Sequence, residues 1–429
     1  MTRFAQFAIL LGLLVCAPAI AGTQVEKNYG DDPNAPIDER YGRASAFHKE
    51  GRLDEAFKIY DVILSERPAD VPVIITYANM LWKIGQLDAA EQRFRQALSL
   101  SPNHIKAHQW LGQLLLHRGQ RKAAKGVFEG MHELKFMRED VIHSANLNLG
   151  KIALMEEEWR KVRKIFRRLR ADGNKADRKS SERGLARMKD MMTAFSWSRV
   201  DGKHIYVHFA PGVQKLKDKA SRESYVQGLD RWIESAVATL GMKMPEPWHL
   251  YVFGDDIECG LVMGRPTAHN WDYSWWLSHT AETSRFDPRH TLAVQLVARV
   301  GGSRPMSRSM VEGFCAWLAG VPKDGHAAAR RLMAAGSLPS IVTLHNSQRR
   351  LPQYEAGMSF VQYLLDTYGL DKFLAMWRRL NVTVSSERFK VGVTRSVKWQ
   401  EAYDELFQRA FGADLSSIEG SWRSMLKRN

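Results

Sequence analysis

Small, aromatic and turn-forming residues recur at a constant spacing through the first half of the chain. Four series of positions share this spacing: Ala44, Ala78 and Gly112; Gly51, Gly85 and Gly119; Ala56, Ala90 and Ala124; and Tyr60, Phe94 and Phe128. Small residues let two helices cross closely, and an aromatic on the second helix fills the space beside them. The pattern predicts stacked helix pairs that begin near Arg40.

The stretch "ITYANMLWKIGQLDAAEQRFRQALSLSPNH" resembles the tetratricopeptide repeat, with Gly85 in the turn and Pro102 after the second helix. A divergent fourth unit follows, with Gly150 in the small-residue place and Glu157 where the turn glycine belongs. We predict about four repeats over 40–170. The resemblance implies a concave groove that binds a peptide or helix of a partner protein. The alternative is that the stack supports the rest of the chain.

Beyond the repeats the pattern changes to short alternating runs. The segment 171–195 is polar, charged and contains glycines, which predicts a basic linker. The alternation in "HIYVHFA" (His204–Ala210) and the run "WHLYVF" (Trp248–Phe253) predict two strands, separated by a helix that ends at Gly241.

Four alternating residues in "AHNWDYSWWLSH" predict a third strand: His269, Trp271, Tyr273 and Trp275. Two interpretations stay open, a strand that lines a cleft at the edge of a sheet and a buried aromatic strand. Asp287 and Pro288 then predict the start of a helix, as N-cap and first-turn residue of "RHTLAVQLVARV".

This order of strands and helices over 196–429 resembles the peptidase MA-like, or gluzincin, metallopeptidases, which are often joined to tetratricopeptide repeats in exported bacterial proteins. In that family a His-Glu-x-x-His helix and a later Glu-Gly hold zinc. His290 matches the first histidine and Glu312, followed by Gly313, matches the third ligand. The expected fold class is therefore mainly α: a helical solenoid followed by an α+β gluzincin-like domain.

The residues of the reaction depart from the family pattern. Thr291 occupies the place of the general-base glutamate, and a neutral hydroxyl does not accept a proton from metal-bound water near neutral pH. Val294 occupies the place of the second histidine and has no lone pair for a metal. We therefore predict a domain without catalysis, metal or cofactor, in which His290 and Glu312 are the relic of a zinc site.

An enzyme remains the alternative to this pseudoenzyme prediction. A zinc peptidase or hydrolase with rearranged ligands would retain His290 and Glu312 and recruit His269, His279 or Glu282. The chain has no Gly-x-Ser-x-Gly elbow, no phosphate-binding glycine loop and no paired-cysteine metal motif, so other common chemistries have no support.

Residues 1–21 have the pattern of a cleaved export signal, with Arg3, an apolar run and the small-x-small site Ala19-Ile20-Ala21. A membrane anchor is a weaker alternative because the apolar run is shorter than the roughly 20 residues needed to span a bilayer. A polar lead-in over 22–39 follows. We predict an exported, periplasmic protein with no transmembrane segment after signal cleavage. Its two remaining cysteines, Cys259 and Cys315, either pair or are both buried.

The 429 residues carry a formal net charge of +15. Such a chain can attract nucleic acid or anionic polymers, and export argues against nucleic acid. The densest basic stretch, 159–179, is either a solvated helix face or a site for anionic envelope components. These patterns together predict a binding or scaffolding protein of the cell envelope.

Overall fold

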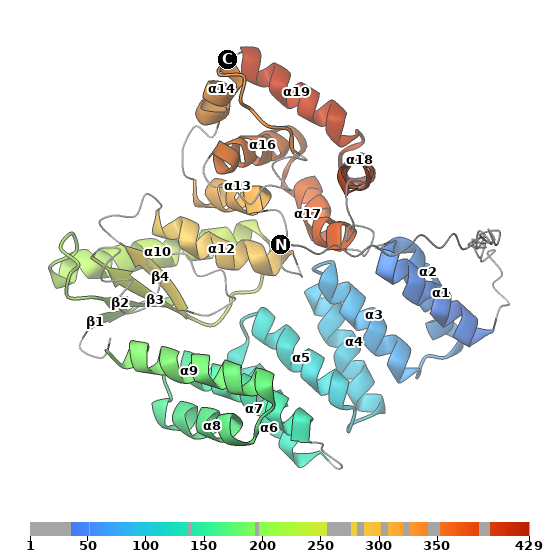
Figure 1. The fold of residues 1–429 in the computed structure, drawn as a ribbon, viewed down its shortest axis with the longest axis vertical. Coiled ribbons are helices and arrows are strands. Elements are labelled where there is room, and N and C mark those ends of the chain that lie inside the picture. Colours follow the sequence, from blue (N-terminus) through green and yellow to red (C-terminus); the bar gives the residue numbers. More distant parts are fainter. Residues whose placement is uncertain are drawn as a thin grey trace, which may run out of the picture.

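The computed structural model describes residues 36–50, 52–134, 139–193, 197–254, 276–280, 287–301, 308–320, 326–341, 352–385 and 395–428. The protein is mainly helical, and repeated helix pairs in the first half precede a small sheet and further helices (Figure 1). The predicted fold class, a solenoid followed by an α+β half, is confirmed. None of the helices in these residues is long and apolar enough to cross a membrane.

The first half follows the chain as an arc of helices (Figure 1). Its elements are α1 (Ile37–Glu50), α2 (Leu53–Glu66), α3 (Val71–Lys83), α4 (Leu87–Leu100), α5 (Ile105–His117), α6 (Arg121–Gly130), η1 (Met131–Glu133), α7 (Glu139–Met155), α8 (Trp159–Asp172) and α9 (Lys175–Thr193). Ala44 and Ala78 are fully buried at the crossings. At Gly112 an added Cβ would lie 2.5 Å from the ring of Phe128, so the close approach requires a glycine.

The last unit differs from its prediction. The segment 171–195, predicted as a basic linker, instead contains helix α9. Gly184 of α9 follows Gly150 at the same interval that separates Gly119 from Gly85, and the ring of Phe166 lies between Gly150 and Gly184. Gly184, which suggested a flexible segment, is thus a residue at a helix crossing. The repeat spacing continues for one more helix, α9. Exposed charged side chains on α9 gave the segment the composition of a linker.

The second half contains a four-stranded sheet with strand order β1-β2-β3-β4. Its elements are β1 (Ser198–Asp201), β2 (Ile205–Phe209), α10 (Lys219–Thr239), β3 (Trp248–Phe253), β4 (Trp276–Thr280), α12 (Pro288–Val300), α13 (Arg308–Ala319), α14 (His326–Ala334), α16 (Pro352–Tyr368), α17 (Leu370–Ser385), α18 (Arg395–Phe411) and α19 (Leu415–Arg428). β1 pairs antiparallel with β2, whereas β2, β3 and β4 are parallel. β2 and β3 are the two strands predicted on either side of a helix.

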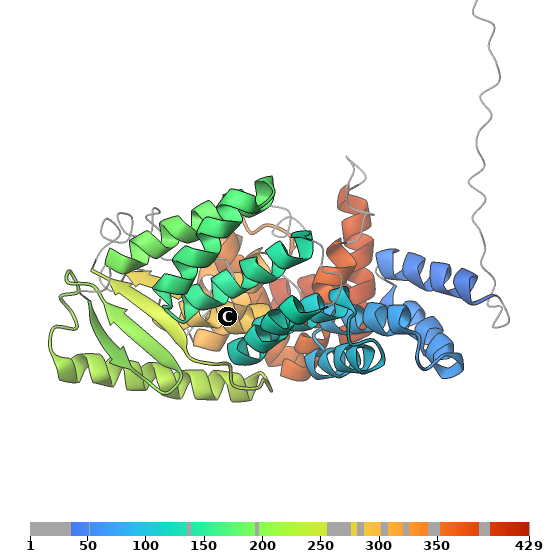
Figure 2. The same ribbon diagram turned by 90° about the horizontal axis from the view of Figure 1, so that it is seen from below.

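The sheet lies between two layers of helices that come from different halves of the chain (Figure 2). On one face, Phe209 contacts Tyr225 of α10, and Arg299 of α12 lies over the ring of Trp248. On the other face, Tyr251 reaches Glu157 between α7 and α8. Parallel strands need cover on both faces, and the last helices of the solenoid provide one of these covers. Buried residues of α7 and α8 accordingly belong to the same apolar core as the sheet.

The solenoid contacts the second half along the edge formed by the turns within its helix pairs. The contacts beside four successive turns are Asp54 with Arg379 (2.7 Å), Asp88 with Lys243 (2.6 Å), the Gly119 carbonyl with the Glu246 amide (3.1 Å) and Glu157 with Arg199 (3.1 Å). We call this edge the turn seam. It fixes the position of every helix pair relative to the second half.

Candidate functional site

The structure places His290 and Glu312 in direct contact inside the second half. The side chain of Asp287 accepts a hydrogen bond from the amide of Arg289 at 2.8 Å, which confirms the predicted N-cap of α12. His290 lies in the first turn of α12 and Glu312 lies on α13, with 3.2 Å between Nε2 and Oε2. Both residues are buried. The two positions that the resemblance paired on separate helices therefore meet in space.

The neighbours of this pair add no metal ligand. Thr291 is buried, and Val294 packs against the apolar core. Across the described stretches, no third histidine, cysteine, aspartate or glutamate joins His290 and Glu312 in a metal-sized group.

The nearby Cys315 does not offer a thiolate. Burial and the charge of Glu312 raise the pKa of the Cys315 thiol well above its usual value, so this thiol stays protonated. The interpretation of the pair as a relic zinc site stays a prediction.

The proposed cleft lining cannot be placed, since His269, Trp271, Tyr273 and Trp275 lie outside the described residues. The same is true of Glu282 and Cys259. The strand β4 begins directly after them and pairs with β3 at one end of the sheet, and it contains His279. The predicted aromatic strand, with its two interpretations, therefore stays a prediction, as do the two alternatives for the cysteines.

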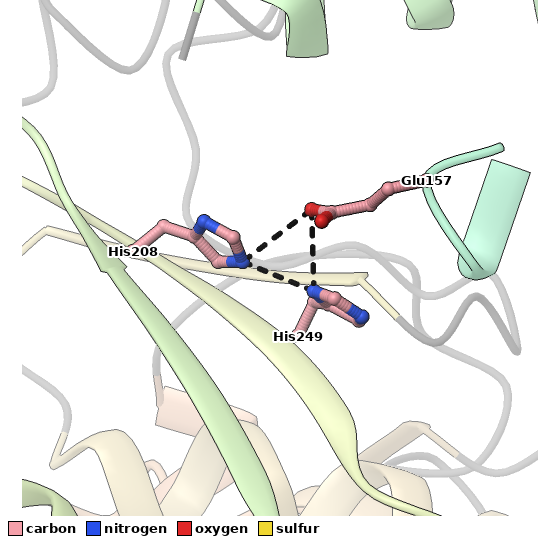
Figure 3. A group of neighbouring side chains, drawn as sticks. All are labelled: Glu157, His208 and His249. Carbon is pink, nitrogen blue, oxygen red and sulfur yellow. Dashed lines mark hydrogen bonds and ion pairs between the residues drawn. The ribbon is translucent and has the colours of Figure 1, made fainter. Parts of the chain in front are cut away.

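A second group of polar side chains meets at the turn seam (Figure 3). Glu157 comes from the turn between α7 and α8, His208 from β2 and His249 from β3. The atoms Nε2 of His208 and Nδ1 of His249 are 3.0 Å apart, and Oε1 of Glu157 lies 3.6 Å and 3.5 Å from them. Because His208 is opposite Tyr251 in the register, the two histidines are diagonal neighbours on one face of the sheet.

The backbone of Glu157 has a conformation that side-chain-bearing residues rarely adopt. Its φ angle is 56°, and no other non-glycine residue in the described segments has a positive φ. The equivalent turn residues, Gly85 and Gly119, have φ angles of 73° and 80°. A left-handed backbone disfavours a residue with a Cβ by about 1–2 kcal/mol. The turn geometry of the repeat is thus preserved, and it directs a carboxylate toward the sheet.

Two polar groups hold this carboxylate. The guanidinium of Arg199 donates to Oε2 of Glu157 at 3.1 Å, and the hydroxyl of Tyr251 donates to Oε1 at 3.3 Å. Burial raises the pKa of Glu157, and the charge of Arg199 opposes this shift. Outer partners of this kind fix the direction in which a carboxylate presents its free lone pairs.

The two imidazoles are kept neutral. Burial lowers the pKa of His208 to about 4 and that of His249 to about 2, and nearby positive charge adds to both shifts. A neutral imidazole has one nitrogen that carries a proton and one that offers a lone pair. At neutral pH two neutral imidazoles therefore lie next to a carboxylate, and each ring has one lone pair to offer, which is a set of donors for a cation.

Sequence patterns did not predict this cluster. Its members lie far apart in the chain, at positions 157, 208 and 249, and no metal motif has such spacings. The one signal in the sequence was Glu157 in the place of a turn glycine, which was interpreted as repeat divergence. The diagonal position of the two histidines depends on the strand register, which the sequence does not state.

The outward face of α8 forms a basic surface. Its exposed basic side chains are Arg160, Lys161, Arg163, Lys164, Arg167, Arg168 and Arg170. The opposite face buries Val162, Phe166 and Leu169 in the core. Two acidic residues at the ends of the helix form ion pairs with this surface: Glu158 with Lys161 at 2.6 Å and Asp172 with Arg168 at 3.7 Å. The helix is amphipathic, and its solvent side carries a net positive charge.

Comparison with known proteins finds a tetratricopeptide repeat within the first half. The tetratricopeptide repeat family model matches residues 85–133. The tetratricopeptide repeat and J domain-containing co-chaperone DNJ1 of Fusarium oxysporum f. sp. lycopersici is 28% identical over 120 residues, which are 28% of this chain and 23% of that protein. Cellulose synthase operon protein C of Pseudomonas fluorescens is 24% identical over 180 residues, which are 38% of this chain and 14% of that protein. The chain spans less than a quarter of either relative.

Proposed function

We propose that the protein is an exported scaffold of the cell envelope, which binds a protein or peptide partner through its tetratricopeptide repeats. The observation that carries the proposal is the position of the turn seam. The solenoid uses the edge at its turns to hold the second half, and exposed side chains along the first helices of the pairs remain for another contact. The named relatives, a repeat-containing co-chaperone and a cellulose synthase operon protein, support a role in protein assembly.

The first helices present a row of polar groups at equivalent positions. Ser45, Asn79 and Gln113 each follow the small crossing residue of their helix by one position, and all three retain solvent exposure. Lys151 occupies the same position in the fourth unit and is exposed. Hydroxyl and amide groups at regular spacing suit the backbone of a peptide, because they donate and accept hydrogen bonds without requiring a fixed charge.

The test is site-specific cross-linking in cells. A photoreactive residue at Gln113, in the row, is compared with one at Gln92, an equally exposed glutamine on α4. The proposal expects discrete cross-linked partners from position 113 and none of the same bands from position 92. Equal products from both positions, or none from 113, contradict it. Fractionation of the same cells tests export, since the proposal places the protein in the periplasm.

In the same proposal the C-terminal half is a gluzincin-like domain without catalysis. The alternative, a zinc peptidase or hydrolase that retains His290 and Glu312, is favoured by their 3.2 Å contact. Metal analysis of the purified chain separates the two, because an active site built on this pair loses its zinc in a His290→Ala variant. Zinc that depends on His290, together with peptidase activity, rejects the scaffold proposal for this domain.

We also propose that the basic surface of α8 contacts anionic components of the envelope. Its exposed cations give a local excess of positive charge over the two acidic groups beside it. Such attraction is screened by salt, so it weakens as ionic strength rises. Co-sedimentation with vesicles of anionic lipid is expected at low salt, with loss in an Arg163→Glu/Arg167→Glu variant. Binding unchanged by this double substitution contradicts the proposal.

A further inference from the structure

We propose that Glu157, His208 and His249 form a binding site for a divalent transition metal ion, with zinc as the best fit, at the turn seam between the solenoid and the sheet (Figure 3). The site is separate from His290 and Glu312 and independent of the proposed partner binding. It joins the turn of the last helix pair to two parallel strands.

The separations of the three donor atoms have the size that a tetrahedral ion requires. Zinc binds imidazole nitrogen and carboxylate oxygen at about 2.0–2.2 Å, which places neighbouring ligands of a tetrahedron about 3.3–3.6 Å apart. The observed separations are 3.0 Å between the histidine nitrogens and 3.5 Å and 3.6 Å to Oε1 of Glu157. One ion can therefore lie at equal distance from all three atoms, and only the gap between the two histidine nitrogens has to widen slightly.

The type of donor selects the class of metal. Calcium and magnesium prefer sets of oxygen ligands, whereas imidazole nitrogen favours zinc and its neighbours in the first transition series. Two imidazoles with one carboxylate leave the fourth position of a tetrahedron for another ligand. Arg199 holds the second carboxylate oxygen, so that Oε1 is the atom directed to the histidines.

The protonation states suit a metal without a net loss of protons. Both rings are buried, and burial favours the neutral form of an imidazole, which is the form that binds a metal. The 3.0 Å contact between Nε2 of His208 and Nδ1 of His249 requires one of these nitrogens to carry a proton. An incoming cation moves this proton to the other nitrogen of the same ring, so both lone pairs then point to the ion.

The backbone at Glu157 is an independent observation. In the earlier turns glycine occupies this left-handed position. In the last turn a glutamate occupies it, despite the strain that a left-handed backbone imposes on a residue with a Cβ. Non-glycine residues in such regions concentrate at functional sites, where the surroundings hold them in place. Here the strained residue is the one that supplies a carboxylate to two buried histidines.

Metal titration of the full, tag-free chain tests the proposal. After chelator treatment the protein is titrated with Co²⁺, whose visible absorption reports a four-coordinate site, and then with Zn²⁺ in competition. Wild-type protein is expected to bind one ion per chain, and the ion is expected to raise the midpoint of thermal unfolding. Glu157→Gly and His249→Gln are expected to weaken binding by about 100-fold or more.

Glu157→Gly is the decisive variant, because glycine is the residue of the equivalent turns and the backbone needs no rearrangement. The Glu157→Gly variant therefore still tests the site if the His249→Gln variant does not fold. The matched control is His204→Gln, which changes a histidine-glutamate contact outside both metal sites, His204 with Glu234 at 2.9 Å, and is expected to leave binding unchanged. Absence of binding in the wild type, unchanged binding in Glu157→Gly, or an equal loss of binding in His204→Gln overturns the proposal.

Discussion

The first three helix pairs and the last unit of the solenoid have the same repeat geometry but different surroundings. The first three pairs, with part of α7, bury one core, which contains Phe94 and Phe128. In the last unit the equivalent Phe166 belongs to the core of the sheet and the C-terminal helices. The turn residue changes in parallel, from Gly85 and Gly119 to Glu157. The repeat is thus a scaffold whose last copy has been adapted to join another structure.

This difference teaches how to interpret departures from a repeat pattern. Small and aromatic residues stay in place in the last unit because helices still cross there, as the position of Phe166 against Gly150 shows. The departures include Glu157, which faces the second half, the basic side of α8, which faces solvent, and the buried Val162, which replaces the alanine of the earlier units. A divergent closing repeat is therefore a place to search for sites as well as a cap.

Removal of the repeat's buried aromatic ring, at Phe128 in one core or Phe166 in the other, is expected to have the largest effect on stability. Phe128→Ala and Phe166→Ala each empty a fully or almost fully buried position, and each is expected to lower the free energy of unfolding by about 3–5 kcal/mol. Hydrogen exchange locates the damage. Phe166→Ala should reduce amide protection in β2 and β3, whereas Phe128→Ala should reduce it in α5 and α6. The same pattern of lost protection in both variants would show a single cooperative core.

The pH dependence of stability tests the turn seam beside the third helix pair. There Nε2 of His117 lies 3.2 Å from the carbonyl oxygen of Arg299. Burial, with a contribution from the charge of Arg299, lowers the pKa of His117 from 6.5 to about 4. Between these values the unfolded chain binds more protons, so stability is intact above pH 6.5 and falls as the pH drops toward 4. The expected loss is about 3 kcal/mol. Urea unfolding of His117→Gln should show a shallower pH dependence, and an identical slope would contradict the prediction.

Exchanging the turn residues tests their different roles. Gly119→Glu introduces a Cβ at a φ angle of 80° and is expected to lower the free energy of unfolding by about 1–2 kcal/mol. Glu157→Gly relieves the same strain but loses hydrogen bonds with Arg199 and Tyr251, so in metal-free protein the net change is expected within about 1 kcal/mol. Chemical denaturation measures both. Equal destabilisation by the two changes would mean that the last turn is ordinary.

Charge reversal on α8 is expected to have the smallest effect on stability. Arg163 and Arg167 are exposed, and substitutions at such surface positions usually change the free energy of unfolding by less than about 0.5 kcal/mol. The double variant Arg163→Glu/Arg167→Glu should therefore melt within a few degrees of the wild type. A large loss of stability would show that the basic surface takes part in the fold.

Much of the fold was predictable because its signals are local. The constant repeat spacing determined the helix pairs and their crossings, and alternation determined β2 and β3. Asp287 and Pro288 determined the start of α12, since capping depends on neighbours in the chain. The contact of His290 with Glu312 followed from a family resemblance and not from spacing alone. Helix α9 was missed because composition does not distinguish a crossing glycine such as Gly184 from a flexible one.

The sequence by itself determined the repeat, the strand positions and the basic surface. Tertiary structure alone decided that the solenoid covers one face of the sheet and that Glu157 meets His208 and His249 there. The physical reason is that periodicity and capping act between residues near in the chain. A cluster whose members come from a turn and two strands depends on register and on the docking of whole elements.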